Sequence, residues 1–144
     1  MREIKFRVWD KRYSEMRYDL THIKFSDVET DGIKKGQILV TTLTPENTTS
    51  EGYGLGTRVL MQYTGFKDKG KEEIYEKDIL GIKHIGGKIE AIGEVLFDPD
   101  FGMFVIRYTN GGWCELWKHL LEKNNEGKEI IGNSCENPEL LNKQ

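Results

Sequence analysis

The feature that most constrains the fold is an alternation of apolar and polar side chains along several short segments. It runs over residues 3–9, 58–64 and 91–108 of the 144-residue chain. Successive side chains of a β-strand point to opposite faces, so a two-residue period places one apolar row on the buried face. The sequence therefore predicts a mainly β protein, a β-rich α+β fold.

The N-terminal segment predicts a β-hairpin. The alternating strand at residues 3–9 leads into a polar, turn-like stretch at Asp10–Glu15, and Met16–Leu20 can return as the second strand. Farther along, Ile38–Leu43 is rich in β-branched residues, which favour strands.

Residues 44–57 divide the chain. They contain Pro45, Asn47 and three glycines, which favour turns and interrupt strands. A connection of this length without secondary structure is uncommon inside one compact domain. We therefore predict two lobes: residues 1–57, with the hairpin, a variable strand and a flexible loop, and residues 58–144.

The second lobe has the pattern of a small barrel. Short strands with Gly and Asp between them are typical of small barrels and sandwiches. Two of these strands are expected to form a hairpin joined at Asp98–Pro99–Asp100. We predict an SH3-like or related barrel.

One or two short helices are expected near the C-terminus. Apolar residues recur at helical spacing in the set Trp113, Leu116, Trp117, Leu120 and Leu121, with a start near Glu115. Asn137 followed by Pro138 is typical of a helix start, so PELLN is expected to form a single closing turn that docks on the core.

Composition limits the classes of function. The formal net charge is -3, so the chain as a whole lacks the basic balance typical of nucleic-acid-binding proteins. Membrane spans need about 20 consecutive apolar residues, and no such run occurs. With two cysteines and no apolar leader, we expect a cytoplasmic protein with reduced thiols.

Three separated motifs occur in order along the chain. They are REIKFRVWD at residues 2–10, MQYTGFKDKGKEEIYEKDIL at residues 61–80 and IIGNSCENPELL at residues 130–141. In order and spacing they resemble the YopX-like proteins of phages and prophages. That family runs from R-x-W-D through Q-Y-T-G-L-x-D-x-x-G-x-x-I-Y-E-G-D-I to G-N-x-x-E-N-P-E-L-L. Residues 20–57 lie outside the resemblance.

The resemblance implies a phage or prophage origin, hence a bacterial host, and a mainly β structure, but no activity. Two positions depart from the family pattern. Lys77 stands where the family usually has Gly, so the turn before Asp78 is not expected to require a positive φ. Ser134–Cys135 replaces a common Ile-Tyr pair, which argues against a family-wide role for this thiol.

A soft-metal site could be built only from Cys114, His119 and Cys135. Zinc takes thiolate and imidazole ligands in a tetrahedron, but C-x4-H with one distant cysteine lacks the usual C-x2-C pair. A fourth ligand would have to come from His84, His22 or a carboxylate. We interpret these residues as ordinary core and surface positions.

The acidic clusters can likewise be interpreted either as a functional site or as ordinary structural residues. Glu73, Glu76 and Asp78 surround Tyr75, and a catalytic or nuclease role near Asp78 is the least favoured hypothesis. We interpret them, with Asp98 and Asp100, as turn-forming and surface residues. The glycines of GYGLG at residues 52–56 lack the Lys-Ser/Thr of a phosphate-binding loop.

Basic and aromatic residues interleave in the first hairpin, a composition that single-strand binders use for stacking on bases. The members are Lys5, Phe6, Arg7, Trp9, Lys11, Arg12, Tyr13, Arg17 and Tyr18. Cross-strand packing in an ordinary hairpin favours the same residues.

We therefore expect no catalytic, cofactor-binding or metal-ligating residue, and no enzyme activity. The first hypothesis is a phage or prophage accessory protein that binds proteins. It forms a homo-oligomer or binds a host or phage protein in the cytoplasm of the bacterial host. The alternative is a nucleic-acid-binding β-barrel that uses the basic hairpin.

Overall fold

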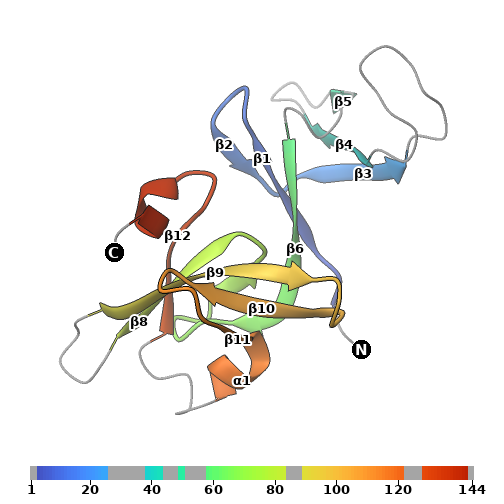
Figure 1. Ribbon diagram of the computed structural model, residues 1–144. Coiled ribbons are helices and arrows are strands. Elements are labelled where there is room, and N and C mark those ends of the chain that lie inside the picture. The colour runs from blue at the N-terminus through green and yellow to red at the C-terminus, as the bar shows by residue number, and fades with distance from the viewer. Residues whose placement is uncertain are drawn as a thin grey trace. The chain divides into compact units, whose positions relative to one another are not determined.

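The computed structural model describes residues 3–25, 38–43, 49–50, 58–83, 89–121 and 128–142 (Figure 1). Strands dominate these ranges, which hold one α-helix and one short 3-10 helix besides. The prediction of a mainly β fold is therefore confirmed.

The contacts divide the chain into two compact units. The 5–62 unit is Lys5–Gln62, and the 63–144 unit is Tyr63–Gln144 together with Met1–Ile4. Strand β6 (Arg58–Lys67) begins in the 5–62 unit and ends in the 63–144 unit.

The 5–62 unit contains the expected N-terminal hairpin. Its strands are β1 (Phe6–Asp10), β2 (Glu15–Arg17), β3 (Leu20–Phe25), β4 (Ile38–Leu43) and β5 (Thr49–Ser50). Antiparallel β1 pairs with β2 on one side and with the first half of β6 on the other, while β3, β4 and β5 form a separate sheet. The loop predicted at residues 44–57 lies outside the described residues except for β5.

Strand β1 is buried on both faces. Arg7 and Asp10 have exposed fractions of 6% and 0%, as low as those of Val8 and Trp9 between them. The alternation correctly predicted a strand, but β1 is the middle strand of β2–β1–β6. Its polar residues therefore need partners inside the protein.

The 63–144 unit is built around a five-stranded antiparallel sheet of order β11–β10–β9–β8–β12 (Figure 1). Its elements are β7 (Glu73–Tyr75), β8 (Asp78–Lys83), β9 (Ile89–Asp98), β10 (Met103–Tyr108), β11 (Trp113–Glu115), α1 (Leu116–Leu121), β12 (Lys128–Asn133) and η2 (Pro138–Asn142). The predicted barrel-like lobe is a curled half-barrel.

One apolar cluster holds this unit together. It consists of Ile74, Leu80, Val95, Phe104, Ile106, Leu116 and Leu120. The predicted β9–β10 hairpin is confirmed by the pairing of Asp98 with Met103. Asp98 Oδ1 accepts the backbone N–H of Asp100 at 2.9 Å, which is the turn chemistry expected for this pair.

The helix begins next to Glu115, as predicted. It begins at Leu116, and Trp113–Glu115 belongs to β11, paired with β10. Leu116 and Leu120 are buried, whereas Trp113 and Trp117 are 53% and 47% exposed. The expected apolar stripe is therefore split: Leu116 and Leu120 reach the core, whereas both tryptophans are exposed.

Polar residues of the middle motif hold turns together. The Asp68 carboxylate accepts the backbone N–H of Glu72 at 2.9 Å and of Ile130, in β12, at 3.1 Å. Asp78 Oδ2 accepts the backbone N–H of Tyr75 at 2.8 Å. Both carboxylates are buried, so these residues act in folding, as the turn-capping interpretation of Asp78 predicted.

The C-terminal motif folds around Asn133. Its Oδ1 accepts the backbone N–H of Cys135 at 3.1 Å and of Glu136 at 2.9 Å. The predicted closing turn is confirmed as η2, where the N–H of Leu140 donates to the carbonyl of Asn137 at 3.1 Å.

The expectation for Lys77 is wrong. Its φ is +69°, so the turn requires the left-handed conformation although the residue is not glycine. Two backbone hydrogen bonds of 2.8 Å impose it: Lys77 N–H donates to Val95, and the Lys77 carbonyl accepts from Ser134.

Replacing Lys77 with glycine is expected to raise the free energy of unfolding by about 1 kcal/mol, because glycine adopts positive φ without steric cost. The ion pair of Lys77 with Glu94, 3.4 Å long and partly exposed, contributes little. Lys77→Ala is the matched control, since it removes the same ion pair and keeps the Cβ. Urea unfolding compares them, and a glycine variant no more stable than the alanine variant would contradict the explanation.

Candidate functional site

The 63–144 unit contains an open groove with a volume of ≈ 560 Å³. Its lining comes from the second half of β6, the β9–β10 hairpin, α1 and the N-terminal segment. The lining residues are Glu3, Tyr63, Thr64, Gly65, Phe66, Phe97, Gly102, Met103, Phe104 and Trp117. We call this surface the groove. Its size is in the range of ligand-binding sites.

Five of the ten residues that line the groove are aromatic. Phe97 and Phe104 are cross-strand partners of β9 and β10, with ring centroids 5.4 Å apart in an edge-to-face arrangement. Phe104 belongs to the core. Phe97 is 44% exposed, and Trp117 of α1 is 47% exposed. Exposed aromatic rings in a concave surface are typical of binding sites.

A second pair of exposed rings lies on the same unit. Phe101 and Trp113 stack with centroids 5.8 Å apart and an interplanar angle of 28°. They remain 60% and 53% exposed. Phe101 directly precedes Gly102, a groove residue, so exposed apolar area extends along the chain beyond the groove itself.

The groove lining has few polar groups, and one of its residues, Glu3, is acidic. Thr64 is already used, because its hydroxyl donates to the carbonyl of Ile74 at 2.8 Å. Glu3 is exposed in the lining, and Asp98 and Asp100 lie in the turn between the two groove strands. Such a surface suits an apolar group that carries a positive charge.

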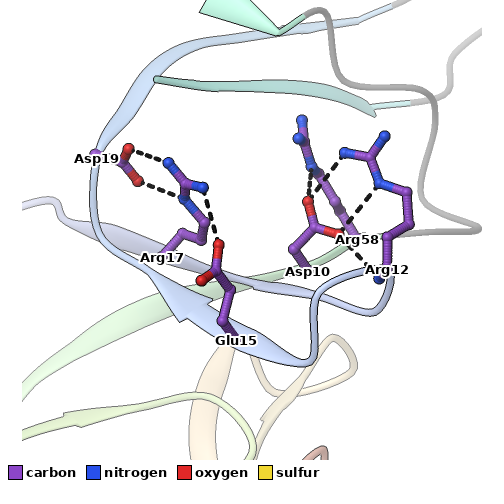
Figure 2. A network of polar contacts seen from close by, with 6 residues as sticks. All are labelled: Asp10, Arg12, Glu15, Arg17, Asp19 and Arg58. Atoms are coloured by element: carbon purple, nitrogen blue, oxygen red, sulfur yellow. Dashed lines mark hydrogen bonds and ion pairs between the residues drawn. The ribbon is translucent and has the colours of Figure 1, made fainter. Parts of the chain in front are cut away.

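In the 5–62 unit the charged residues form a polar network (Figure 2). The Asp10 carboxylate, which is 0% exposed, accepts Arg58 Nε at 2.8 Å and Arg12 Nη2 at 3.0 Å. Burial alone raises the pKa of Asp10, but the hydrogen bonds from Arg12 and Arg58 outweigh it and lower the pKa to about 2. Asp10 is therefore a fixed anion that holds two arginines.

The remaining arginines of the hairpin are also engaged. Arg17 donates to Glu15 at 2.9 Å and to Asp19 at 2.9 Å, and this second contact lowers the pKa of Asp19 (Figure 2). Arg7 is buried, and its Nε contacts Met61 Sδ at 3.4 Å. Two of the basic residues from which the sequence suggested a nucleic-acid interface, Arg12 and Arg17, are thus paired with carboxylates within the hairpin.

Both cysteines are in contact with neighbouring residues. Cys114, on β11, lies with its Sγ 3.4 Å from the hydroxyl of Tyr108, and Cys135 lies in the turn after β12. Among the described residues no group of three His, Cys, Asp or Glu side chains could hold a metal ion. The side chains of His22 and His119, together with His84 and the GYGLG stretch, lie outside them.

Two of the acids near Tyr75 have internal partners. The hydroxyl of Tyr75 donates to Glu73 at 2.9 Å, and Asp78 caps the Tyr75 N–H.

Within the described ranges no helix is both long and apolar enough to cross a membrane.

Sequence reasoning missed the groove. Trp117 fits the apolar stripe of a core-facing helix, but it lies about 100° around α1 from the buried Leu116 and is exposed. Phe97 carried no usable signal either, because it is two residues from the buried Val95 and so lies on the same face of β9.

These observations define the class: a small, mainly β protein in which motif residues stabilise turns and an aromatic groove remains open. The chain belongs to the YopX protein family, whose model matches residues 5–142. Protein EF1440 from Enterococcus faecalis has a similar crystal structure, with 28% identity, a TM-score of 0.59 and coverage of 98% of this chain and 99% of that one.

Protein yopX from Bacillus subtilis has a similar fold as well. It is 21% identical, with a TM-score of 0.59 and coverage of 97% of this chain and 98% of that one. A comparison with curated proteins gave no match.

Proposed function

We propose that this protein is a non-enzymatic accessory protein of a phage or prophage that acts by protein association through the groove. The observation that carries the proposal is the exposure of Phe97 and Trp117, 44% and 47%, in a concave aromatic surface. Large exposed apolar surface costs free energy in water, which a bound protein recovers. Its place of action is the cytoplasm of the bacterial host.

The partner is a second copy of this chain. The 63–144 unit with its N-terminal residues carries sixteen Asp and Glu against twelve Lys and Arg, whereas the 5–62 unit carries eight against nine. Unlike units of two copies therefore attract one another, and like units repel. Nucleic acid is the weaker candidate, because Arg12, Arg17 and Arg58 are paired with carboxylates and the groove lining contains no Lys or Arg.

The test is concentration-dependent self-association of the full chain. In sedimentation velocity we expect oligomers at tens of micromolar for the wild type, and at least about tenfold weaker association for Trp117→Ser, since truncating a central tryptophan removes a typical hot spot. Ile89→Ser is the matched control, because Ile89 is a 39% exposed apolar residue of the same unit that does not line the groove.

A wild-type chain that remains monomeric at tens of micromolar would contradict the proposal. If Trp117→Ser and Ile89→Ser weakened self-association equally, the groove would not be the surface through which the copies associate.

A further inference from the structure

The turn between β1 and β2 is an exposed projection with a distinctive composition. Its residues Lys11–Arg12–Tyr13–Ser14 are all exposed, and Tyr13 is 67% exposed, close to the highest value among the large apolar and aromatic residues described. We call these four residues the hairpin tip. It presents one aromatic ring, preceded in sequence by Lys11 and by Arg12, whose guanidinium pairs with Asp10.

The hairpin tip is held in one conformation. Asp10 Oδ1 accepts the backbone N–H of Arg12 at 3.0 Å, and Asp10 Oδ2 accepts the Nη2 of its guanidinium at 3.0 Å. The Arg12 guanidinium in turn lies over the Tyr13 ring, 5.4 Å from its centroid. Because Asp10 is anchored in the buried strand β1 by Arg58, presenting Tyr13 to a partner costs little additional conformational entropy.

The groove has the complementary chemistry. Its exposed rings, Phe97 and Trp117, offer faces for an aromatic side chain, and Glu3 adds a carboxylate to the lining. Asp98 and Asp100 stand in the adjoining turn, with Lys118 as the cation next to Trp117 in sequence. Carboxylates near aromatic faces favour a ring accompanied by Lys or Arg.

We propose that the hairpin tip of one copy inserts into the groove of another, with Tyr13 against the aromatic walls and Lys11 toward the carboxylates. This inference rests on the proposed function and names the segment that fills the groove. The tip belongs to the 5–62 unit and the groove to the 63–144 unit, so each copy carries one of each. The contact joins unlike surfaces, and such contacts build rings, reciprocal pairs or filaments.

Two single variants and their mixture test the contact. Tyr13→Ser lacks the tip but keeps the groove, and Trp117→Ser lacks the groove ring but keeps the tip. We expect each variant alone to associate at least about tenfold more weakly than the wild type in sedimentation velocity. An equimolar mixture is expected to form a 1:1 complex, because it restores one intact tip and one intact groove.

Controls distinguish the possible failures. Tyr18→Ser removes a tyrosine of the same unit that is 64% exposed but lies outside the tip, and is expected to associate like the wild type. Lys11→Glu is expected to weaken association, and Asp100→Lys in the other copy to restore it. Circular dichroism verifies that each surface variant is folded.

Tyr13→Ser that associates like the wild type would overturn the inference while leaving self-association through the groove intact. A mixture that stays monomeric would also overturn it, because the two surfaces would then not be partners. A wild-type chain that stays monomeric would instead contradict both the proposed function and this inference.

Discussion

Replacing Arg58 with methionine is expected to lower the free energy of unfolding by about 3 kcal/mol, because it removes the buried partner of the buried Asp10 carboxylate and leaves the partly exposed Arg12 to compensate its charge. Asp10 and Arg58 are 0% and 2% exposed, and Arg58 Nε lies 2.8 Å from Asp10 Oδ2. Methionine retains the apolar packing of the arginine stem. Urea unfolding at neutral pH measures the loss.

The matched control is Arg12→Met. Arg12 reaches the same carboxylate at 3.0 Å, but its side chain is 35% exposed and water can replace it. Arg12→Met is expected to lower the free energy of unfolding by about 1 kcal/mol, in the range of exposed ion pairs. Equal losses for the two variants would show that burial does not decide the strength of the pair.

The pH dependence gives this prediction a second readout. The pKa of Asp10 is about 2 in the folded protein against an ordinary value of 3.8, so the folded-state pKa lies below the unfolded one. The stabilisation is therefore complete above about pH 4 and is lost as the pH falls toward about 2. It amounts to about 2 kcal/mol in the wild type. In Arg58→Met this acid-dependent part becomes smaller.

Gly132→Ala is expected to lower the free energy of unfolding by about 3 kcal/mol, because the new methyl group collides with a constrained neighbour. A Cβ at this position would lie 2.4 Å from Asn137 Oδ1. Asn137 Oδ1 accepts the backbone N–H of Asn133 at 3.4 Å, so moving the side chain away would break this hydrogen bond. The same Cβ would also lie 3.1 Å from Leu140 Cδ1.

Gly111→Ala separates collision from backbone strain. Gly111 has φ of +90°, yet a Cβ there would meet no atom within 4 Å. Its loss is expected to be about 1 kcal/mol from the conformation alone. If thermal or urea unfolding gave the same loss at both glycines, the contact with Asn137 would not be the cause at Gly132.

Local patterns predicted the elements well. The alternation at residues 3–9 and 91–108 predicted β1, β9 and β10, because side-chain direction in a strand depends only on position along it. Turn residues at Asp98 and Asn137 marked the connections for the same local reason: their side chains bond to backbone a few residues away.

Lys77 shows where local reasoning fails. A lysine gives no signal for positive φ, and only hydrogen bonds to Val95 and Ser134, which are distant in sequence, impose that conformation. The groove is similar, since its rings come from β6, the β9–β10 hairpin and α1.

By itself, the sequence determined that this chain is a mainly β protein, where its strands and turns lie, and which family motifs it carries. Tertiary structure alone decided that Asp10 pairs with Arg58, that Trp117 is exposed, and that an aromatic groove stays open. The reason is physical: strand periodicity is a property of neighbouring residues, whereas burial and charge pairing depend on segments that only folding brings together.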